Sequence, residues 1–495
     1  MKKNDEQEQK TLIEDFLTMF KNLFKKTKLT VKKVAATLVS CFVVAIAFLW
    51  NVDIGAQIFT GRLILFIMLY ALFGFYSGRS ITVKRRSDSE VVLLSLLTAV
   101  YYITCVLIRD ISFMGDYMPV SIVLPTALIV MLITISVDSR LSNIYALILP
   151  LGAFLTGCFD VDSYIFATAS GVSGSLVLTG ARRRIDLVKS GIIVAGTNLA
   201  AVIAVLLLNG CPGEKYPWII FWSLLNGVAS GMLVLGILPI IENALHLATT
   251  FKLIELLDVG APLLKKLAAQ APGTYSHTMM VATLADEACR EIGAKGLLAR
   301  VGAYYHDIGK MDQPDYFVEN QTLYNKHNEL NPRLSATVIR SHVKLGVEKA
   351  RAIGLPTEVI DIIAEHHGNS PIMWFYNAAM EREGNVDMED FCYPGNPPRS
   401  KESAAVMLAD VTEAATRTLE KPNAARLETF IQKLFDDKVQ HDQLAESALT
   451  FHDLEVIKNI FVRVLAGHYH HRIEYPKVTK EADKETTPNG DNETK

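Results

Sequence analysis

Long apolar stretches fill the first half of the chain and are absent from the second half. Between residues 34 and 241 the sequence contains eight such runs, and their interiors carry no charged residue. They are Val34–Trp50, Leu63–Tyr76, Val91–Ile108, Pro119–Ser136, Leu141–Cys158, Tyr164–Gly180, Gly191–Leu208 and Trp218–Ile241. A helix needs roughly 17–25 residues to cross a bilayer. The pattern therefore predicts a polytopic membrane region at 34–241 with about eight helices, of which the second has the least defined ends.

Positively charged residues gather in alternate connections between these runs. Lysines and arginines are frequent before residue 34 and in the loops 78–90 and 181–189, whereas the loops 109–118 and 159–163 contain no lysine. Cytoplasmic loops of membrane proteins carry an excess of lysine and arginine. We therefore expect both termini and the second half of the chain on the cytoplasmic side, which agrees with an even number of spans.

The segments that flank the membrane region have patterns of their own. Residues 1–33 repeat apolar positions every three to four residues between lysines, which predicts a basic amphipathic helix on the inner leaflet; a solvated coil is the alternative. Helical periodicity continues through 242–270, which predicts a helical linker, and then through an all-α domain at 271–475. The charged, polar tail 476–495 is expected to be disordered.

Four glycines fall in the last three apolar runs where helices could approach each other closely, namely Gly171, Gly174, Gly227 and Gly231. The same runs lack ionisable residues of the kind that a transport pathway needs. The membrane region is therefore expected to be a packed bundle that anchors the chain in the lipid bilayer, rather than a transporter.

Composition and charge narrow the function classes. Half of the residues are hydrophobic and the mean hydropathy is +0.25, which is high for a soluble protein. A formal net charge of −3 provides no surplus of positive charge, so a nucleic-acid polymer is not an expected partner. The six cysteines form no CxxC pair, which favours free thiols in a reducing compartment over a disulfide framework.

All twelve histidines lie from His246 onward, and helical periodicity places several of them on buried faces. His277 shares a face with the apolar residues Val281, Leu284 and Ala288. The pair His306-Asp307 ends the next helix, which Gly309 is expected to terminate.

Three further helices carry polar residues of the same kind. His342 shares a face with Leu334 in a helix that begins at Asn331-Pro332. The pair His366-His367 closes another helix, and Asp410 lies on the core side of a third. Each of these residues alone can be explained as a hydrogen-bonded core or capping residue.

The whole set is harder to explain without a metal. Burying so many ionisable groups together without partners would be costly, and a divalent cation removes the cost because neutral imidazoles and carboxylates are its ligands. We therefore predict a metal site formed by His277, His306, Asp307, His342, His366, His367 and Asp410. The remaining histidines lie in polar or terminal contexts and are not expected to bind metal; they include His327, His441, His452, His468, His470 and His471.

The order of these residues resembles the HD superfamily of metal-dependent phosphohydrolases in its binuclear form. The segments "GTYSHTMMVA", "AYYHDIGKMDQ", "IIAEHHG" and "DFCYPGNPP" more specifically resemble the seven-transmembrane HD proteins of bacteria, the PgpH-type cyclic-di-AMP phosphodiesterases. The resemblance extends over residues 60–476. Family members carry a large extracytoplasmic domain after the first membrane helix. Only residues 51–62 separate the first two runs here, so we expect that domain to be missing.

The resemblance implies a reaction and roles for individual residues. One ion would be held by His277, His306, Asp307 and Asp410, and the other by Asp307, His342 and His366, with Asp307 as the bridge. His367 would complete the edge of the second site or contact phosphate. Lys310 would meet a phosphate oxygen, a surface lysine being the alternative. The two ions, manganese or iron, would activate water to open cyclic di-AMP to pApA at the bacterial cytoplasmic (inner) membrane, with His306, Asp307 and Lys310 taking part in catalysis.

Other functions remain open at this point. Another HD substrate, cyclic di-GMP or ppGpp, is one alternative, although the GYP motif of cyclic-di-GMP enzymes does not follow His366-His367. A non-catalytic nucleotide-binding membrane receptor is another, although such a protein is free to lose ligands and this one keeps the full set. A homodimer is compatible with either.

Overall fold

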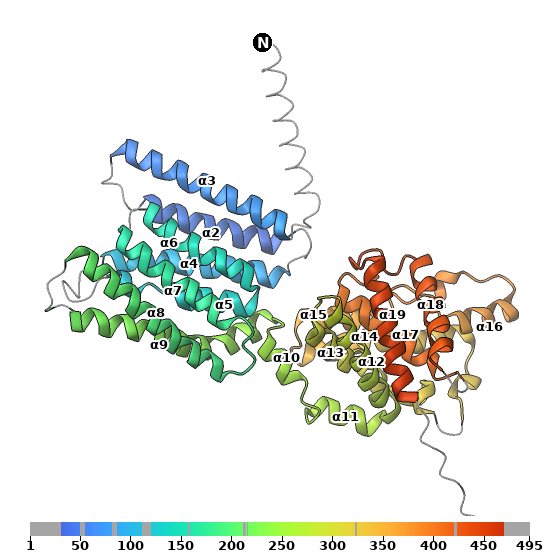
Figure 1. Ribbon diagram of the computed structural model, residues 1–495. Coiled ribbons are helices and arrows are strands. Elements are labelled where there is room, and N and C mark those ends of the chain that lie inside the picture. The colour runs from blue at the N-terminus through green and yellow to red at the C-terminus, as the bar shows by residue number, and fades with distance from the viewer. Residues whose placement is uncertain are drawn as a thin grey trace, which may run out of the picture.

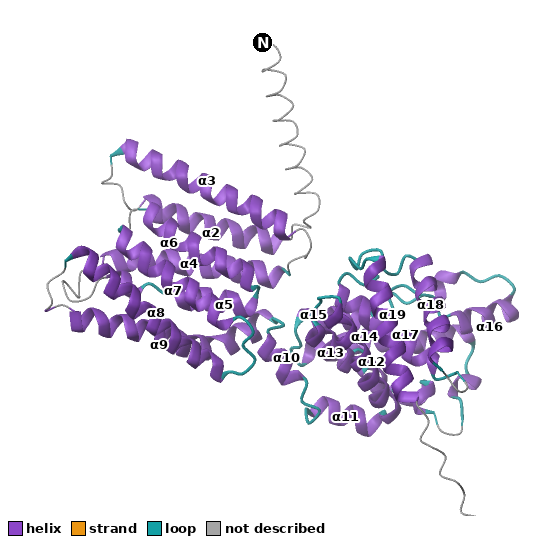
Figure 2. Ribbon diagram, in the orientation of Figure 1, coloured by secondary structure: helices purple, strands orange, loops and turns teal. Residues whose placement is uncertain are grey.

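The computed structural model describes residues 31–49, 55–81, 87–110, 120–156, 159–210, 214, 216–321, 324–419 and 423–469. Within these ranges the chain forms two helical bundles, one from each half of the sequence (Figures 1 and 2). The described residues contain no β-sheet, only an isolated bridge between Pro371 and Cys392. The predicted all-α fold is confirmed. Most of the expected basic amphipathic segment at 1–33, as well as the tail 476–495, lies outside the described residues.

Each of the eight apolar runs has a counterpart in one helix of the first bundle. These helices are α2 (Val31–Leu49), α3 (Ala56–Ile81), α4 (Asp88–Asp110), α5 (Thr126–Ser136), α6 (Ser139–Leu155), α7 (Val161–Leu178), α8 (Ile185–Asn209) and α9 (Tyr216–Leu245). Among the described residues, α4, α7, α8 and α9 are long and apolar enough to cross a membrane. α5 is shorter because a 3-10 turn (Val120–Val123) and Pro125 break the fourth run. The number of spans stays a prediction.

Glycines let these helices approach each other closely, as the sequence predicted. A Cβ on Gly227 of α9 would lie 2.4 Å from the Cα of Ala195 on α8. A Cβ on Gly231 would lie 2.7 Å from a backbone oxygen of α8. Gly171 and Gly174 of α7 are also in close contact with neighbouring helices. Because the obstacles facing α9 are backbone atoms, a larger residue at Gly227 or Gly231 would force α8 and α9 apart.

The second bundle surrounds a central helix, α17 (Lys401–Thr416), whose residues 402–410 are all buried. Its other helices are α12 (Pro272–Glu291), α13 (Gly296–Tyr305), α14 (Pro332–Ala352), α15 (Thr357–Glu365), α16 (Met373–Glu383), α18 (Ala424–Gln440) and α19 (Phe451–Tyr469). Short 3-10 helices connect several of them, including η4 (Ile308–Asp312) after α13 and η6 (Val318–Asn320). The fully buried stretch Ala404–Ala409 includes three alanines, which allow α12, α13 and α15 to pack closely against α17.

The segment between the bundles is helical, as predicted, but it is not one continuous helix. α9 ends at Leu245, and His246 adopts a left-handed backbone with φ of +50°. Two short helices follow, α10 (Thr250–Leu256) and α11 (Pro262–Gln270). Leu253 of α10 is buried in the core of the second bundle, and Phe251 of the same helix is buried in the core of the first. The linker therefore packs against both bundles and is not a free spacer.

Polar contacts join the two bundles at this segment. Arg184, just before α8, forms ion pairs with Glu255 of α10 at 2.6 Å and with the buried Glu242 of α9 at 3.3 Å. The backbone carbonyl of His246 accepts a hydrogen bond from the backbone N–H of Thr357 at 3.1 Å. Thr357 is the first residue of α15, and His366 follows the last residue of the same helix. The end of the membrane bundle is therefore in direct contact with a helix that carries a predicted ligand.

Candidate metal centre

The predicted ligands on α12 and α13 owe their positions to ordinary helix periodicity. His277 is buried on the same stripe of α12 as Val281, Leu284 and Ala288, which confirms the predicted face. His306 follows the last residue of α13 and keeps a helical backbone, so its side chain continues the buried face of that helix. Asp307 follows and directly precedes the first residue of η4.

Gly309 does not terminate α13 in the way expected. The helix already ends at Tyr305, the chain continues directly as η4, and Gly309 does not have a positive φ. The glycine is required for a different reason: a Cβ there would lie 1.9 Å from the carbonyl oxygen of His342 on α14. This close approach holds η4 against α14 and brings Asp307 near His342.

The predicted start of α14 is confirmed, but its predicted buried face is wrong in part. Asn331 caps the helix by accepting a hydrogen bond from the backbone N–H of Leu334 at 2.7 Å, and Pro332 is the first helical residue. Leu334 itself is 47% exposed. The buried face passes instead through Ser335, His342 and Gly346. Small and polar residues form the packing surface, so hydrophobicity alone pointed to the wrong side.

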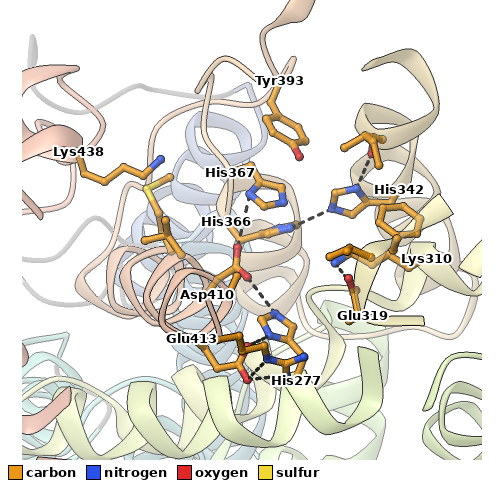
Figure 3. A pocket seen from close by; sticks show the side chains of 17 residues that line it. His277, Lys310, Glu319, His342, His366, His367, Tyr393, Asp410, Glu413 and Lys438 are labelled. Atoms are coloured by element: carbon orange, nitrogen blue, oxygen red, sulfur yellow. Dashed lines mark hydrogen bonds and ion pairs between the residues drawn. The ribbon is translucent and has the colours of Figure 1, made fainter. Parts of the chain in front are cut away.

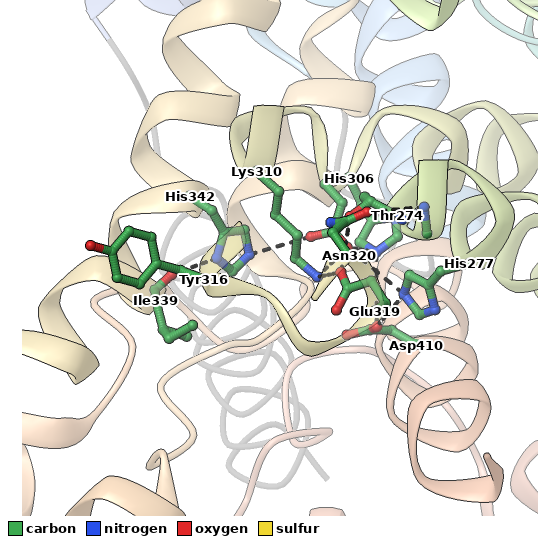
Figure 4. Close-up of polar contacts among 12 residues, drawn as sticks. Thr274, His277, His306, Lys310, Tyr316, Glu319, Asn320, Ile339, His342 and Asp410 are labelled. Carbon is green, nitrogen blue, oxygen red and sulfur yellow. Dashed lines mark hydrogen bonds and ion pairs between the residues drawn. The ribbon is translucent and has the colours of Figure 1, made fainter. Parts of the chain in front are cut away.

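The structure brings all seven predicted ligands together (Figures 3 and 4). Five of them line one cavity, and His306 and Asp307 lie buried against these five. Their ligand atoms form three overlapping groups, in each of which the atoms lie within 4.8 Å of one another. The groups are His277, His306 and Asp410; His306, Asp307 and His366; and His342, His366 and His367.

Asp307 lies between two sets of imidazole nitrogens. Its Oδ2 is 3.2 Å from His306 Nε2 and 3.8 Å from His277 Nε2. Its Oδ1 is 3.4 Å from His342 Nε2 and 3.8 Å from His366 Nε2. Each oxygen of the carboxylate thus faces a different pair of histidines, which is the arrangement that a carboxylate bridging two ions requires.

Asp410 and His367 complete the two sides of the cluster. Asp410 Oδ1 lies 3.0 Å from His277 Nε2 and 3.8 Å from His306 Nε2. His367 Nδ1 is 3.5 Å from Asp410 Oδ2, and its ring stacks on Tyr393 with 4.2 Å between ring centroids. Although His367 is adjacent to His366, both rings reach the cavity, so the expected divergence of neighbouring side chains does not remove His367 from it.

Backbone hydrogen bonds determine which nitrogen of each ring faces the cluster. The Nδ1 atoms of His306, His342 and His366 each bond to the carbonyl oxygen three residues earlier, at 2.7, 2.6 and 2.8 Å. A carbonyl only accepts, so Nδ1 carries the hydrogen and Nε2 of the neutral ring presents a lone pair. His277 Nδ1 bonds in the same way to the carboxylate of Glu413. Orientation of this kind is typical of metal-ligating histidines.

The buried atoms of the cluster fit a divalent cation. Asp307 is only 1% exposed. Among the described residues neither its Oδ1 nor His306 Nε2 makes a hydrogen bond, while its Oδ2 is paired with the Lys310 ammonium group. Burial opposes the charged form of His306, but Asp307 and Asp410 outweigh it and raise the pKa of His306 to about 10. A proton thus balances the carboxylates when no ion is bound, and a cation held by the same nitrogen and oxygen atoms would replace it.

The two sides of the cluster differ in charge. Burial lowers the pKa of His342 to about 4, and burial with the nearby His306 lowers the pKa of His366 to about 3. These rings are therefore neutral near pH 7. On the other side, hydrogen bonds with Asp410 and Glu413 outweigh burial and raise the pKa of His277. The carboxylates are concentrated around His277 and His306, so that side has the stronger attraction for a cation.

Lys310 contacts Asp307, the carboxylate that could bridge two ions. Its Nζ forms an ion pair with Asp307 Oδ2 at 2.7 Å and donates a hydrogen bond to Glu319 of η6 at 2.9 Å. Burial lowers the pKa of Lys310, but the charges of Asp307 and Glu319 outweigh it, and the pKa is raised. The residue also lines the cavity, and its role in binding or catalysis stays a prediction.

Several residues at the cavity were not predicted from the sequence. Glu413 lies one turn after Asp410 on α17, and that spacing was a usable signal. Tyr393 lies within the quoted segment "DFCYPGNPP". Glu319 and Lys438 come from segments that reach the cavity only through the tertiary fold. The cavity has a volume of about 280 Å³.

The histidines excluded from the site lie elsewhere where the structure describes them. His327 bonds to the carbonyl oxygen of Tyr316 at 2.8 Å, and His441 and His452 are exposed. Among the described residues none of them belongs to a group that could hold a metal. His470 and His471 lie outside the described residues.

Comparisons with known proteins agree with this architecture. Residues 56–249 match the family model of the 7TM receptor with intracellular HD hydrolase, and residues 274–415 match the model of the HD domain. The cyclic-di-AMP phosphodiesterase PgpH of Bacillus subtilis is 34% identical over 85% of this chain and 60% of its own length. PgpH of Listeria monocytogenes is 32% identical over 84% of this chain and 59% of its own length. The chain thus spans about three fifths of these relatives.

Solved structures of the L. monocytogenes PgpH HD domain are also similar in sequence. One is 40% identical and covers 43% of this chain and 100% of that domain, with a TM-score of 0.41. The same domain in complex with cyclic-di-AMP is 40% identical and covers 42% of this chain and 99% of that domain, with a TM-score of 0.42.

Proposed function

The chain belongs to the family of seven-transmembrane receptors with an intracellular HD hydrolase, and we propose that it hydrolyses cyclic di-AMP to pApA. Two curated relatives, which share about a third of their aligned residues with this chain, are named cyclic-di-AMP phosphodiesterases. The membrane region anchors the protein, and the distribution of lysine and arginine favours a cytoplasmic location for the HD domain.

One observation carries the proposal: Asp307 is buried between two pairs of histidine Nε2 atoms, and each of its oxygens faces a different pair. In this proposal one ion is held by His277, His306, Asp307 and Asp410, and the other by Asp307, His342 and His366, with His367 at the edge. Two divalent ions, manganese or iron, supply a water of lowered pKa and offset negative charge on phosphoryl oxygens.

In this scheme other residues of the chain orient the proposed metal ligands and form the cavity for the substrate. Lys310 holds Asp307 on the side of Oδ2, and Glu413 holds His277 through Nδ1. The described residues that line the cavity include no serine, threonine or cysteine. In this proposal the nucleophile is water. His367 and Tyr393 form a flat wall on which a base of the substrate could stack.

The test is a substrate panel with the purified full-length protein in detergent and manganese. Cyclic di-AMP, cyclic di-GMP and ppGpp are supplied separately, and products are identified by chromatography. We expect turnover of cyclic di-AMP to pApA and its loss in Asp307→Ala, together with loss of bound metal. Turnover of ppGpp alone would refute the proposed substrate, and an equally active Asp307→Ala variant would refute the proposed site.

A further inference from the structure

Lys438 lines the cavity of the candidate metal centre but belongs to none of the ligand groups. It is a residue of α18, near the end of that helix. In Figure 3 it lies across the cavity from Lys310 and His342, with His366, His367 and Asp410 between them. The cavity therefore has a cation on each of two opposite walls.

The partners of these cations differ. Lys310 pairs with Asp307 and Glu319, and the third cation at the cavity, Arg417, pairs with Glu413. Lys438 donates a hydrogen bond to the hydroxyl of Ser370 at 2.9 Å. Among the described residues no carboxylate lies within ion-pair distance of Lys438.

Ser370, the hydrogen-bond partner of Lys438, belongs to the segment that follows the predicted ligands His366 and His367. The serine is three residues after His367, and its carbonyl oxygen accepts a hydrogen bond from the backbone N–H of Tyr393 at 3.1 Å. The Tyr393 ring in turn stacks on His367. The ammonium group is thus held at a defined place beside the His367–Tyr393 wall.

An ammonium group in this position favours an anionic ligand. Burial lowers the pKa of Lys438, because the longer-range attraction of Asp437 and Asp410 does not compensate for lost solvation. An anion bound in the cavity would supply the negative charge that the Lys438 ammonium group lacks nearby. Lysine presents a compact charge with several donors, which suits a phosphate oxygen.

We propose that Lys438 binds the second phosphodiester group of a cyclic dinucleotide while the first lies at the metal centre. The proposal rests on the function proposed above. A cyclic dinucleotide has two phosphodiesters, each with one negative charge, and only one of them is cleaved at a time. The cavity offers the uncleaved group a cation without a carboxylate partner, on the wall where His367 and Tyr393 are stacked.

The test compares two substrates in the full-length protein. Cyclic di-AMP has two phosphodiesters, whereas bis(p-nitrophenyl) phosphate has one. For Lys438→Gln we expect KM and Kd for cyclic di-AMP to rise about tenfold, as for loss of a hydrogen bond to a charged group. Hydrolysis of bis(p-nitrophenyl) phosphate should be unchanged. Lys438→Arg should retain most of the affinity, and Lys433→Gln, at an exposed site on the same helix, is the matched control.

Two results would overturn the role of Lys438: equal losses on both substrates, or unchanged binding of cyclic di-AMP. Calorimetric Kd values for wild type and Lys438→Gln provide this readout without turnover. If the proposed function itself is wrong, the result differs from both of these, because the wild type would then not hydrolyse cyclic di-AMP. The calorimetric comparison still decides the role of Lys438 in that case, and equal or absent binding by the two proteins would refute it.

Discussion

The two bundles bury polar side chains in different ways. In the membrane bundle, most buried polar side chains are hydroxyls and amides, which bond to backbone carbonyl oxygens or to each other. Ser142 lies 2.5 Å from Ser175, and the side chain of Asn198 donates to that of Asn226 at 3.1 Å. In the HD bundle, seven ionisable side chains point at one place, and Asp307 Oδ1 and His306 Nε2 have no hydrogen-bond partner in the described structure.

This difference distinguishes the membrane bundle, which has a structural role, from the HD bundle, which contains the candidate metal centre. A hydroxyl pair satisfies itself and needs nothing further, so it adds specificity to helix packing. A cluster of imidazoles and carboxylates is satisfied only by a cation or by protons, so its stability and its chemistry depend on what is bound. The following predictions test that contrast, beginning with the largest expected effect.

Glu413 holds His277 through Nδ1, so its removal should weaken metal binding without removing a proposed ligand. We expect Glu413→Ala to lower metal affinity or turnover about 10- to 100-fold, as for other partners of metal-ligating histidines. Metal affinity is measured by competition with a chelating dye. Glu428→Ala, at an exposed position on α18, is the control. Unchanged metal affinity in Glu413→Ala would contradict a metal-ligating role of His277.

A substitution at Gly227 tests whether close packing of α8 and α9 stabilises the membrane bundle without affecting the metal centre. A Cβ at this position collides with the backbone of Ala195, whereas a Cβ at Gly236 on the same helix meets nothing within 4 Å. We expect Gly227→Ala to destabilise the protein by about 1–3 kcal/mol, as overpacking does. Gly236→Ala should be neutral or slightly stabilising.

The measurement for this pair is thermal unfolding in detergent, with metal content determined on the folded fraction. Metal content should be the same in both variants, because the cluster lies wholly within the HD bundle. Equal stability of Gly227→Ala and Gly236→Ala would show that α8 and α9 do not pack as described.

Ser142 should show the smallest effect. Its bond to Ser175 joins α6 and α7, and hydrogen bonds between membrane helices contribute about 0.6 kcal/mol on average. We expect Ser142→Ala to destabilise the bundle by roughly that amount. Ser173→Ala, whose hydroxyl bonds within its own helix, is the control. A loss as large as that of Gly227→Ala would mean that polar contacts, rather than close packing, dominate this bundle.

Local pattern was sufficient for the features that depend on neighbouring residues. The eight apolar runs correspond to eight helices, the Asn331-Pro332 start of α14 is confirmed, and the buried stripe of His277 on α12 is as predicted. The predictions from local pattern failed where contacts with a distant part of the chain determine the position of a residue. Gly309 is needed for contact with α14 rather than as a helix terminator, and Leu334 lies on the exposed side of its helix.

The sequence by itself determined the helices, the all-α class and the set of ligand-type residues, because hydrophobic periodicity and side-chain chemistry are properties of short segments. Only the tertiary structure decided that the oxygens of Asp307 face two different histidine pairs, that Glu413 orients His277, and that Lys438 reaches the same cavity. Most of these relations join residues far apart in the chain, such as His277 and Glu413, which are 136 positions apart. Their distances depend on how the helices pack around α17 rather than on any local pattern.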